Sequence, residues 1–330
     1  MKNPLSFSRR SLLAAVAMIA AGFEHAAIAQ ENYPTKPVTL IVPFTPGGSN
    51  DVIARVIGQR LSQIWSQAVI VDNKAGAAGS IGTDHVAKAP EDGYKLLITN
   101  NNTMSINPVL LPKTPYAVAR DFAQVMQLGT VPIVLVANSN VKATTVKELV
   151  ALAKAAPGKL SYASSGSGSP QHLSAELFKA MTGTDITHVG YKGAAPAITD
   201  MLAGQVDLQF GAINSLLPHI RAGKLRALAV GGTRRASLLA DVPTMAEAGL
   251  SQYDSEIWLG LAAPAGTPAA VIKRINADVT KILNEPEVKE KLAEQGIETR
   301  PSTPHEMTKL IEKDSARWAS VIKSAGIKAD

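Results

Sequence analysis

Two glycine- and serine-rich turns, about a hundred residues apart, constrain this chain most. Each follows an apolar run and opens an amphipathic helix: PFTPGGSND at residues 43–51 and SSGSGSPQH at 164–172. Gly and Ser allow backbone N–H groups to approach a ligand, and the positive end of the helix behind them favours negative charge. Two such turns in separate halves of a chain predict two lobes that close on a small anion.

The first 29 residues predict export. Lys2, Arg9 and Arg10 precede an apolar stretch at residues 12–21 that is too short to span a membrane. Ala27 and Ala29 supply the small-residue pattern of a signal peptidase site, so we expect cleavage after Ala29 and a periplasmic location. The paired arginines also fit a twin-arginine signal, and the sequence leaves the choice between the two export routes open.

Composition excludes several classes of protein. The chain of 330 residues contains no Cys, which excludes disulfides, thiolate metal sites and a Cys nucleophile. Its formal net charge of +6 is mild, and no dense basic block with interleaved aromatics is present, so we expect no nucleic-acid partner. The His residues lack metal-ligand spacing, and we expect neither a metal nor a cofactor.

Alternating strand-like and helix-like segments predict an α/β fold with mainly parallel sheets flanked by helices. Capping boxes at Thr145, Thr244 and Thr303 mark helix starts. Two longer strand-like stretches, residues 122–138 and 253–264, resemble crossings between lobes. We therefore expect one lobe at residues 33–130 plus 258–330 and the other at 131–257, with hinges near residues 129–132 and 258–260.

Nine segments in order along the chain resemble one family, the substrate-binding proteins of tripartite tricarboxylate transporters (Bug-type receptors). They are YPTKP (33–37), PFTPGGSND (43–51), VDNKAGAAGSIG (71–82), APEDGY (89–94), SSGSGSPQHLSAE (164–176), YKGAAPA (191–197), LAGQVD (202–207), DVPTMAEAG (241–249) and APAGTP (263–268).

The resemblance implies a two-lobed, flytrap-like periplasmic binding protein with two hinge strands. Such a receptor is a monomer without enzymatic activity that captures a small carboxylated molecule and presents it to membrane permease subunits. It holds the carboxylate mainly through backbone groups and ordered waters. Many members carry an acidic or amide residue where this chain has Gly211. That difference either leaves room for a larger ligand or removes a hydrogen bond that would recognise an amine.

The site expected from these arguments lies on loops at the ends of strands. In the first lobe, Gly47 and Gly48 offer backbone groups at a positive-φ turn, Phe44 offers an apolar wall, and Asp51 acts through its backbone or a water. A second loop and the residues after the next strand add further candidates: Ala78, Gly79, Asn100 and Thr103. The second lobe contributes the remaining ones: Ser165, Ser167, Ser169, His172, Tyr191, Gly193 and Ala194.

Two other functions compete with the receptor. Ser169 and His172 are three residues apart and could form a nucleophile–base pair in a secreted hydrolase, but no orienting acid is evident and the G-x-S-x-G elbow is absent. A solute sensor that docks on a signalling protein would share every feature noted above. The sequence favours the receptor, and it does not identify the carboxylate.

Overall fold

The computed structural model describes residues 33–111, 113–191 and 193–328, so the predicted leader at residues 1–29 lies outside the described part. The strands are β1 (Val38–Val42), β2 (Val69–Asn73), β3 (Lys95–Asn100), β4 (Phe122–Asn138), β5 (Ser161–Ser164), β6 (Thr187–Gly190), β7 (Leu208–Ala212), β8 (Leu225–Val230), β9 (Glu256–Pro264) and β10 (Glu298–Thr299). The described residues contain no helix that is long and apolar enough to cross a bilayer.

Helices connect these strands. The α-helices are α2 (Ser49–Trp65), α3 (Ser80–Ala87), α4 (Asn107–Leu110), α5 (Val118–Asp121), α6 (Val146–Ala155), α7 (Pro170–Thr182), α8 (Ala194–Leu202), α9 (Ile213–Arg221), α10 (Ala269–Asn284), α11 (Pro286–Glu294) and α12 (Pro304–Ala325). Two short 3₁₀ segments, η1 (Ala77–Gly79) and η3 (Ser237–Leu239), and one π-helical segment, η2 (Asn102–Ile106), complete the described chain.

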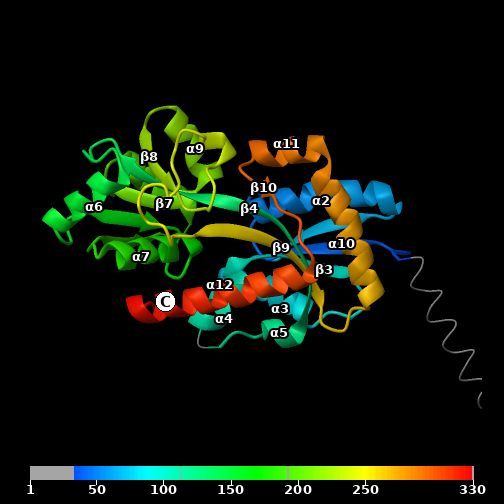
Figure 1. Ribbon diagram of the computed structural model, residues 1–330. Helices are drawn as coiled ribbons and strands as arrows, with labels where there is room; N and C mark the ends of the chain where they lie inside the picture. Colours follow the sequence, from blue (N-terminus) through cyan, green and yellow to red (C-terminus); the bar gives the residue numbers. More distant parts are fainter. Residues whose placement is uncertain (1–32, 112, 192, 329–330) are drawn as a thin grey trace, which may run out of the picture.

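The strands form one curled sheet in the order β2-β1-β3-β9-β4-β7-β5-β6, with β8 and β10 also pairing with β4. We call β2, β1, β3, β9 and the start of β4 the first section, and the end of β4 with β7, β8, β5 and β6 the second section (Figure 1). In the first section β1 pairs in parallel with β2 and β3, and in the second section β5 pairs in parallel with β6 and β7. The strand β9 runs antiparallel to its neighbours β3 and β4, and β4 runs antiparallel to β7 and β8. The partner of β4 changes from β9 to β7 between Pro132 and Ile133.

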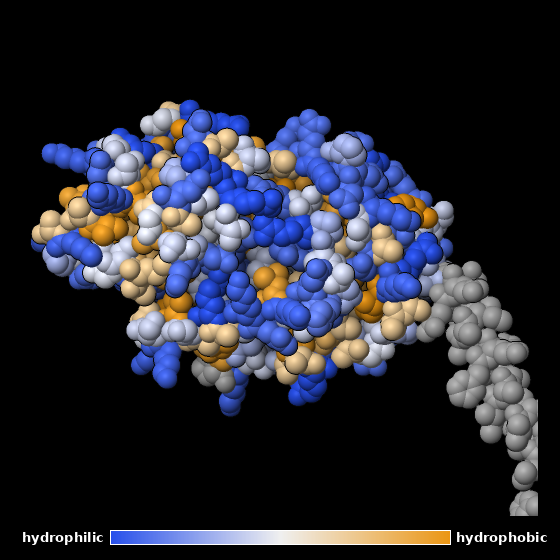
Figure 2. All heavy atoms as spheres, in the orientation of Figure 1, coloured by the Kyte–Doolittle hydropathy of each residue, from blue (hydrophilic) through white to orange (hydrophobic). Residues whose placement is uncertain are grey.

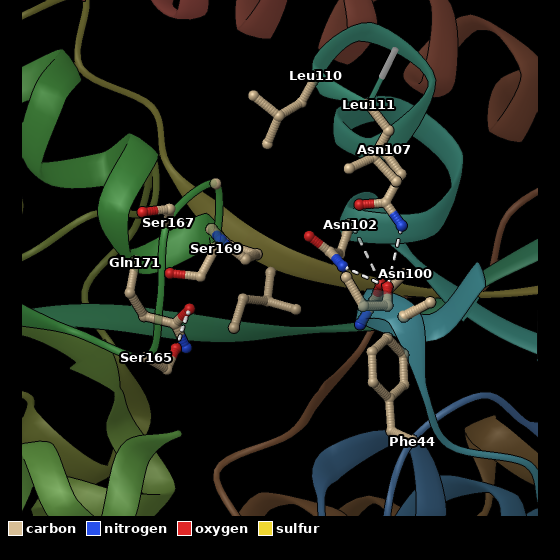
Figure 3. A pocket seen from close by; sticks show the side chains of 15 residues that line it. Phe44, Asn100, Asn102, Asn107, Leu110, Leu111, Ser165, Ser167, Ser169 and Gln171 are labelled. Atoms are coloured by element: carbon tan, nitrogen blue, oxygen red, sulfur yellow. Dashed lines mark hydrogen bonds between the residues drawn. The ribbon is translucent and has the colours of Figure 1, made fainter. Parts of the chain in front are cut away.

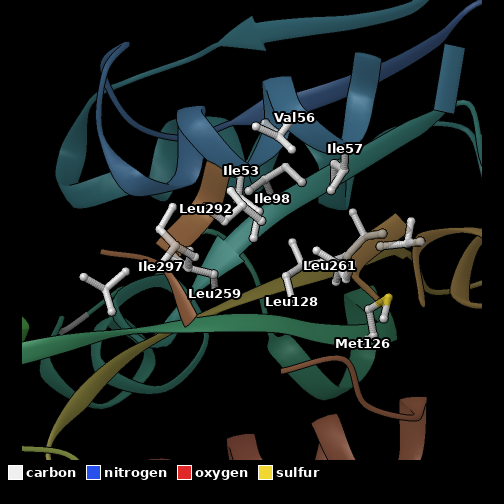
Figure 4. Packing of buried hydrophobic residues seen from close by; sticks show 14 of the residues in the cluster. Ile53, Val56, Ile57, Ile98, Met126, Leu128, Leu259, Leu261, Leu292 and Ile297 are labelled. Carbon is white, nitrogen blue, oxygen red and sulfur yellow. The ribbon is translucent and has the colours of Figure 1, made fainter. Parts of the chain in front are cut away.

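Helices cover both faces of each section. Figure 4 shows one face of the first section, where Ile53 and Ile57 of α2 pack on Ile98, Leu128 and Leu261 of the sheet. The opposite face packs on α3 and α12 through a second cluster that includes Val86 and Met307. Because each helix presents one apolar stripe, this three-layer arrangement buries the sheet on both sides.

The helix α12 contacts both sections. Its first half packs on the first section, while Trp318 and Val321 of its second half lie in a cluster with Ile106 of η2 and Leu173 of α7. In Figure 1 the C-terminal end of α12 accordingly lies beside α7. Figure 2 shows the same face as a mainly hydrophilic surface on which hydrophobic residues form small, separate areas.

The strands expected from the sequence are confirmed, with ends that differ by up to three residues and with the whole of β4 in place, but β6 and β10 were missed. The capping box at Thr303 is complete, since Thr303 and Glu306 exchange hydrogen bonds at 3.2 and 2.7 Å. The box at Thr244 forms the same pair of bonds with Glu247, yet the chain there makes only a turn. The prediction of a helix at Thr244 was therefore wrong, because no continuous apolar stripe follows it.

Candidate ligand-binding site

A cavity of about 640 Å³ lies between the two sections of the sheet, at the carboxyl ends of several parallel strands. Figure 3 shows its two walls, with the serine turn of α7 facing the loops that follow β1, β2 and β3. The lining residues are Phe44, Ala77, Ala78, Asn100, Asn102, Asn107, Leu110, Leu111, Ser165, Ser167, Gly168, Ser169, Pro170, Gln171 and Ile257. Among the residues that the structure describes, none that lines this cavity is charged.

The loop between β2 and α3 forms part of the first wall in an unusual conformation. Ala77 and Ala78 have φ values of +46° and +51°, and the flanking Gly79 has +89°. Two amides, from Asn102 and Asn107, donate to the carbonyl oxygen of Ala78 at 2.8 and 2.9 Å and hold the loop in this left-handed form. Non-glycine residues with positive φ are costly and concentrate at ligand sites. Strain at this wall is therefore an independent sign of function.

Asparagines after β3 hold the rest of that wall. The Asn100 oxygen accepts from the backbone N–H groups of Asn102 and Thr103, and its amide donates to Asn50 at 3.1 Å. The stretch that follows is π-helical, a rare conformation that is frequent at functional sites. Thr103 itself is fully buried, with its hydroxyl 2.6 Å from that of Thr99, and does not line the cavity.

Of the first glycine turn, only Phe44 lines the cavity. Gly47 and Gly48 are exposed to solvent, and the positive φ belongs to Gly47 (+87°), whereas Gly48 has φ −76°. The expectation of positive φ at Gly48 was therefore wrong, because Gly48 takes the extended conformation of an N-cap residue. Gly79 lies behind the wall, where an added Cβ would come within 3.0 Å of the Phe44 ring.

The carboxylate of Asp51 is turned inward and fully engaged. It accepts from Gly47 N–H at 3.0 Å, from Arg55 at 2.9 Å and from Asn73 at 3.0 Å. Burial alone would raise the pKa of Asp51, but these hydrogen bonds outweigh it and lower the pKa below its usual value. Asp51 thus locks the first turn and does not reach the cavity.

The serine turn forms the second wall. Ser165 donates to the Gln171 oxygen at 3.0 Å, and Ser169 caps α7 by accepting the His172 backbone N–H at 3.2 Å. The His172 ring accepts the backbone N–H of Gly168 at 3.0 Å, so its Nδ1 atom is bound to the main chain. Ser165, Ser167 and Ser169 line the cavity, whereas His172 is buried behind it.

Three predicted residues after β6 lie away from the lining. Tyr191 donates to Asp200 at 2.8 Å, and burial together with that carboxylate raises its pKa to about 12. Gly193 and Ala194 begin α8 and are partly exposed. Gly211 likewise does not line the cavity, because an added Cβ there would meet the Leu216 side chain at 2.5 Å. The idea that Gly211 enlarges the ligand space therefore has no support in this geometry.

Several lining residues escaped the sequence argument. Asn107, Leu110 and Leu111 follow the asparagine-rich stretch that begins at Asn100, and that stretch could have indicated them. Ile257 comes from β9, and nothing in its local sequence marks it as a lining residue. Gln171 follows Ser169 in the first turn of α7, where the helix start could have indicated it.

The fold and the cavity define a class: α/β binding proteins with the periplasmic-binding-protein fold, which hold a solute between two parts of a sheet. Residues 53–327 match the sequence model of the "Tripartite tricarboxylate transporter family receptor". The chain belongs to this family of solute receptors and is not an enzyme.

Relatives and solved structures agree with this assignment. The chain is 39% identical to protein BugT of Bordetella pertussis, over 92% of this chain and 93% of BugT. Among solved structures it resembles Rpa4515 of R. palustris with adipate, at 38% identity and a TM-score of 0.81, covering 90% of this chain and 99% of that one. It also resembles MatC of Rhodopseudomonas palustris with bound malate, at 31% identity and a TM-score of 0.76, covering 88% of this chain and 100% of MatC.

Proposed function

We propose that this protein is a periplasmic receptor that captures a small carboxylated molecule in the cavity and delivers it to the permease subunits of a tripartite tricarboxylate-type transporter. One observation carries the proposal: no described residue that lines the cavity is charged, and the N-terminus of α7 opens onto it without an acidic residue in its first turn. Adipate in Rpa4515 and malate in MatC support the carboxylate class of ligand.

The carboxylate lies, in this proposal, at the serine turn. The positive end of α7, the hydroxyls of Ser167 and Ser169 and the amide of Gln171 supply hydrogen-bond donors there. The carbon skeleton lies against the apolar part of the lining, which comprises Phe44, Leu110, Leu111 and Ile257. Because the lining residues within 33–111, 113–191 and 193–328 carry no charge, they favour binding through neutral donors and water over direct ion pairs.

Residues 33–130 plus 258–330 and residues 131–257 form two lobes in this proposal. The change of partner along β4 between Pro132 and Ile133 supports a hinge at that point. A ligand that touches both walls would favour the closed form by its differential affinity. The protein acts as a monomer in this proposal, and the small, separate hydrophobic areas on the one face that Figure 2 shows are compatible with it.

Native mass spectrometry of protein freshly isolated from the periplasm tests the ligand class directly. We expect a retained small acid, a mature chain that begins at Gln30, and binding of at least one of adipate, malate and citrate by calorimetry. The bound acid should be recovered chemically unchanged. The radius of gyration of the protein should be smaller with the acid than without it. Absence of binding to every carboxylate tested, or conversion of one, would contradict the proposal.

A further inference from the structure

Two stacked histidines lie behind the serine turn. The ring centroids of His172, in the first turn of α7, and His188, on β6, are 3.9 Å apart with an interplanar angle of 8°. Tyr162 of β5 is stacked 4.9 Å from His188, and Ser164 is 2.7 Å from the His188 Nε2 atom. The proposed ligand contacts do not account for this group.

The hydrogen bond between Gly168 and His172 fixes the protonation state of the ring. A backbone amide can only donate, so the Nδ1 atom that accepts from Gly168 at 3.0 Å must carry a lone pair. The ring is then a neutral imidazole with its proton on Nε2. The Ser169 hydroxyl accepts the His172 backbone N–H in return, and the two bonds clamp the start of α7.

The clamp resembles a capping box in which an imidazole replaces the usual carboxylate. In α12 the corresponding position is Glu306, whose carboxylate accepts from Thr303. A carboxylate at position 172 would place negative charge beside the turn, whereas a neutral imidazole supplies the same acceptor without charge. This substitution suits a turn that must receive an anion.

We propose that His172 is a positioning residue that shapes the serine turn through its Nδ1 lone pair, and that protonation of this nitrogen lowers the affinity of the site for carboxylates. An imidazolium would attract the charge of the ligand. However, the protonated Nδ1 would point its hydrogen at the Gly168 N–H. Two donors would then face each other at hydrogen-bond distance without an acceptor between them, which is unfavourable. The turn would have to move, and Gly168 lines the cavity. The affinity part of this inference rests on the proposed function.

The groups around the ring pair are engaged with one another. Glu176 of α7 accepts from Tyr162 at 2.6 Å and pairs with Lys179 at 2.8 Å. Burial, with Glu176 beside it, raises the pKa of Tyr162, which stays neutral. Further titratable groups on the neighbouring elements also have partners: Tyr191 with Asp200, Tyr253 with the Ser174 carbonyl, Asp207 with Ser161, and Arg317 of α12 with Asp254 and Asp314. The nearby carboxylates therefore already have partners of their own.

Two variants at position 172 separate the effect of the Nδ1 lone pair from the effect of the imidazole ring itself. In His172→Asn the side-chain oxygen can take the place of Nδ1 and cannot be protonated between pH 5 and 8, while His172→Leu removes the acceptor. His305→Asn, at an exposed position on α12, is the matched control. Calorimetry with adipate from pH 8 to pH 5, beside ¹⁵N spectra of the histidine rings, measures affinity and protonation together.

We expect the wild type and His305→Asn to lose at least tenfold in affinity as the ring of His172 becomes protonated. His172→Asn should bind like the wild type at pH 8 and keep its affinity at pH 5, and His172→Leu should bind at least tenfold more weakly throughout. Equal pH profiles for the wild type and His172→Asn, or full affinity in His172→Leu, would overturn the inference.

A ligand-free measurement separates this inference from the proposed function. At pH 8 the ¹⁵N spectrum should show the His172 proton on Nε2, and the Gly168 amide should exchange with solvent faster in folded His172→Leu than in the wild type. A proton on Nδ1, or unchanged exchange, would overturn the positioning role even if adipate binds. Conversely, failure of adipate, malate and citrate to bind the wild type would contradict the proposed function alone.

Discussion

The turns that open α2 and α7 are built alike and end up in different roles. In each, the third helical residue accepts the N–H of the glycine before the N-cap: Asp51 from Gly47, and His172 from Gly168. The α2 turn closes on its own carboxylate and lies in solvent, while the α7 turn uses a neutral ring and opens on the cavity. A helix N-terminus that already holds an internal acid has less to offer an external anion. The type of residue at this one position therefore distinguishes the two turns.

The largest expected effect on ligand affinity comes from replacing with alanine the glycine that precedes the N-cap of each of these two helices. Gly47 and Gly168 both have positive φ, at +87° and +72°, so Ala should cost about 1 kcal/mol of stability at either position. Only at Gly168 does the added Cβ run into another side chain, that of Leu110 across the cavity. We expect Gly168→Ala to weaken adipate binding at least about 100-fold, or about 2.7 kcal/mol.

Calorimetry and thermal unfolding of Gly47→Ala and Gly168→Ala together check this expectation. Gly47→Ala is the matched control, since its backbone strain is similar and no atom of the described residues, its chain neighbours aside, lies within 4 Å of the added Cβ. Equal affinities in the two variants would show that the serine turn does not hold the ligand.

Making the α7 turn resemble the α2 turn should be the next largest effect. His172→Asp can accept the Gly168 N–H as Asp51 accepts that of Gly47, so the helix start should remain stable. The added charge should repel a carboxylate and weaken adipate binding about tenfold, or 1.4 kcal/mol. Salt titration of the affinity provides the check, because screening should reduce the difference from the wild type. A salt-independent loss would indicate distortion instead.

Removing the charge from the α2 turn should change stability without changing affinity. Asp51→Asn loses charged hydrogen bonds from Arg55 and Gly47, which predicts about 2 kcal/mol less stability at pH 7. Because the folded pKa of Asp51 is lowered, its contribution is present above the unfolded pKa and is lost as pH falls through the folded pKa. The difference between variant and wild type in urea unfolding should therefore shrink towards pH 3. A constant difference would contradict this role.

The smallest expected effect is the loss of one hydroxyl in the serine turn. Ser167→Ala should weaken adipate binding by about 1 kcal/mol, the contribution of one neutral hydrogen bond, with no change in stability. Ser215→Ala, on α9 and outside the cavity lining, is the control for affinity. Wild-type affinity in Ser167→Ala would show that the ligand does not use this hydroxyl.

Local patterns along the chain predicted much of this arrangement. Apolar runs and glycine turns marked most of the strands, and the strand-like stretch at residues 122–138, although broken by Gly129 and Pro132, predicted β4 in full. The same patterns placed Phe44, Ala78, Asn100 and the three serines near a ligand, and all of these line the cavity. They worked because strand ends and helix starts are encoded by neighbouring residues.

The sequence by itself determined the two turns, the helix starts at Thr145 and Thr303, and the family to which the chain belongs. Only the tertiary structure decided which turn faces the cavity, because that depends on β4 and β9 bringing loops from distant strands together. It also decided that Ile257 and Leu110 complete the lining and that His172 holds Gly168 instead of activating Ser169. The direction in which a turn faces and the residues that it contacts arise from packing between segments far apart in the chain. No pattern of neighbouring residues encodes them.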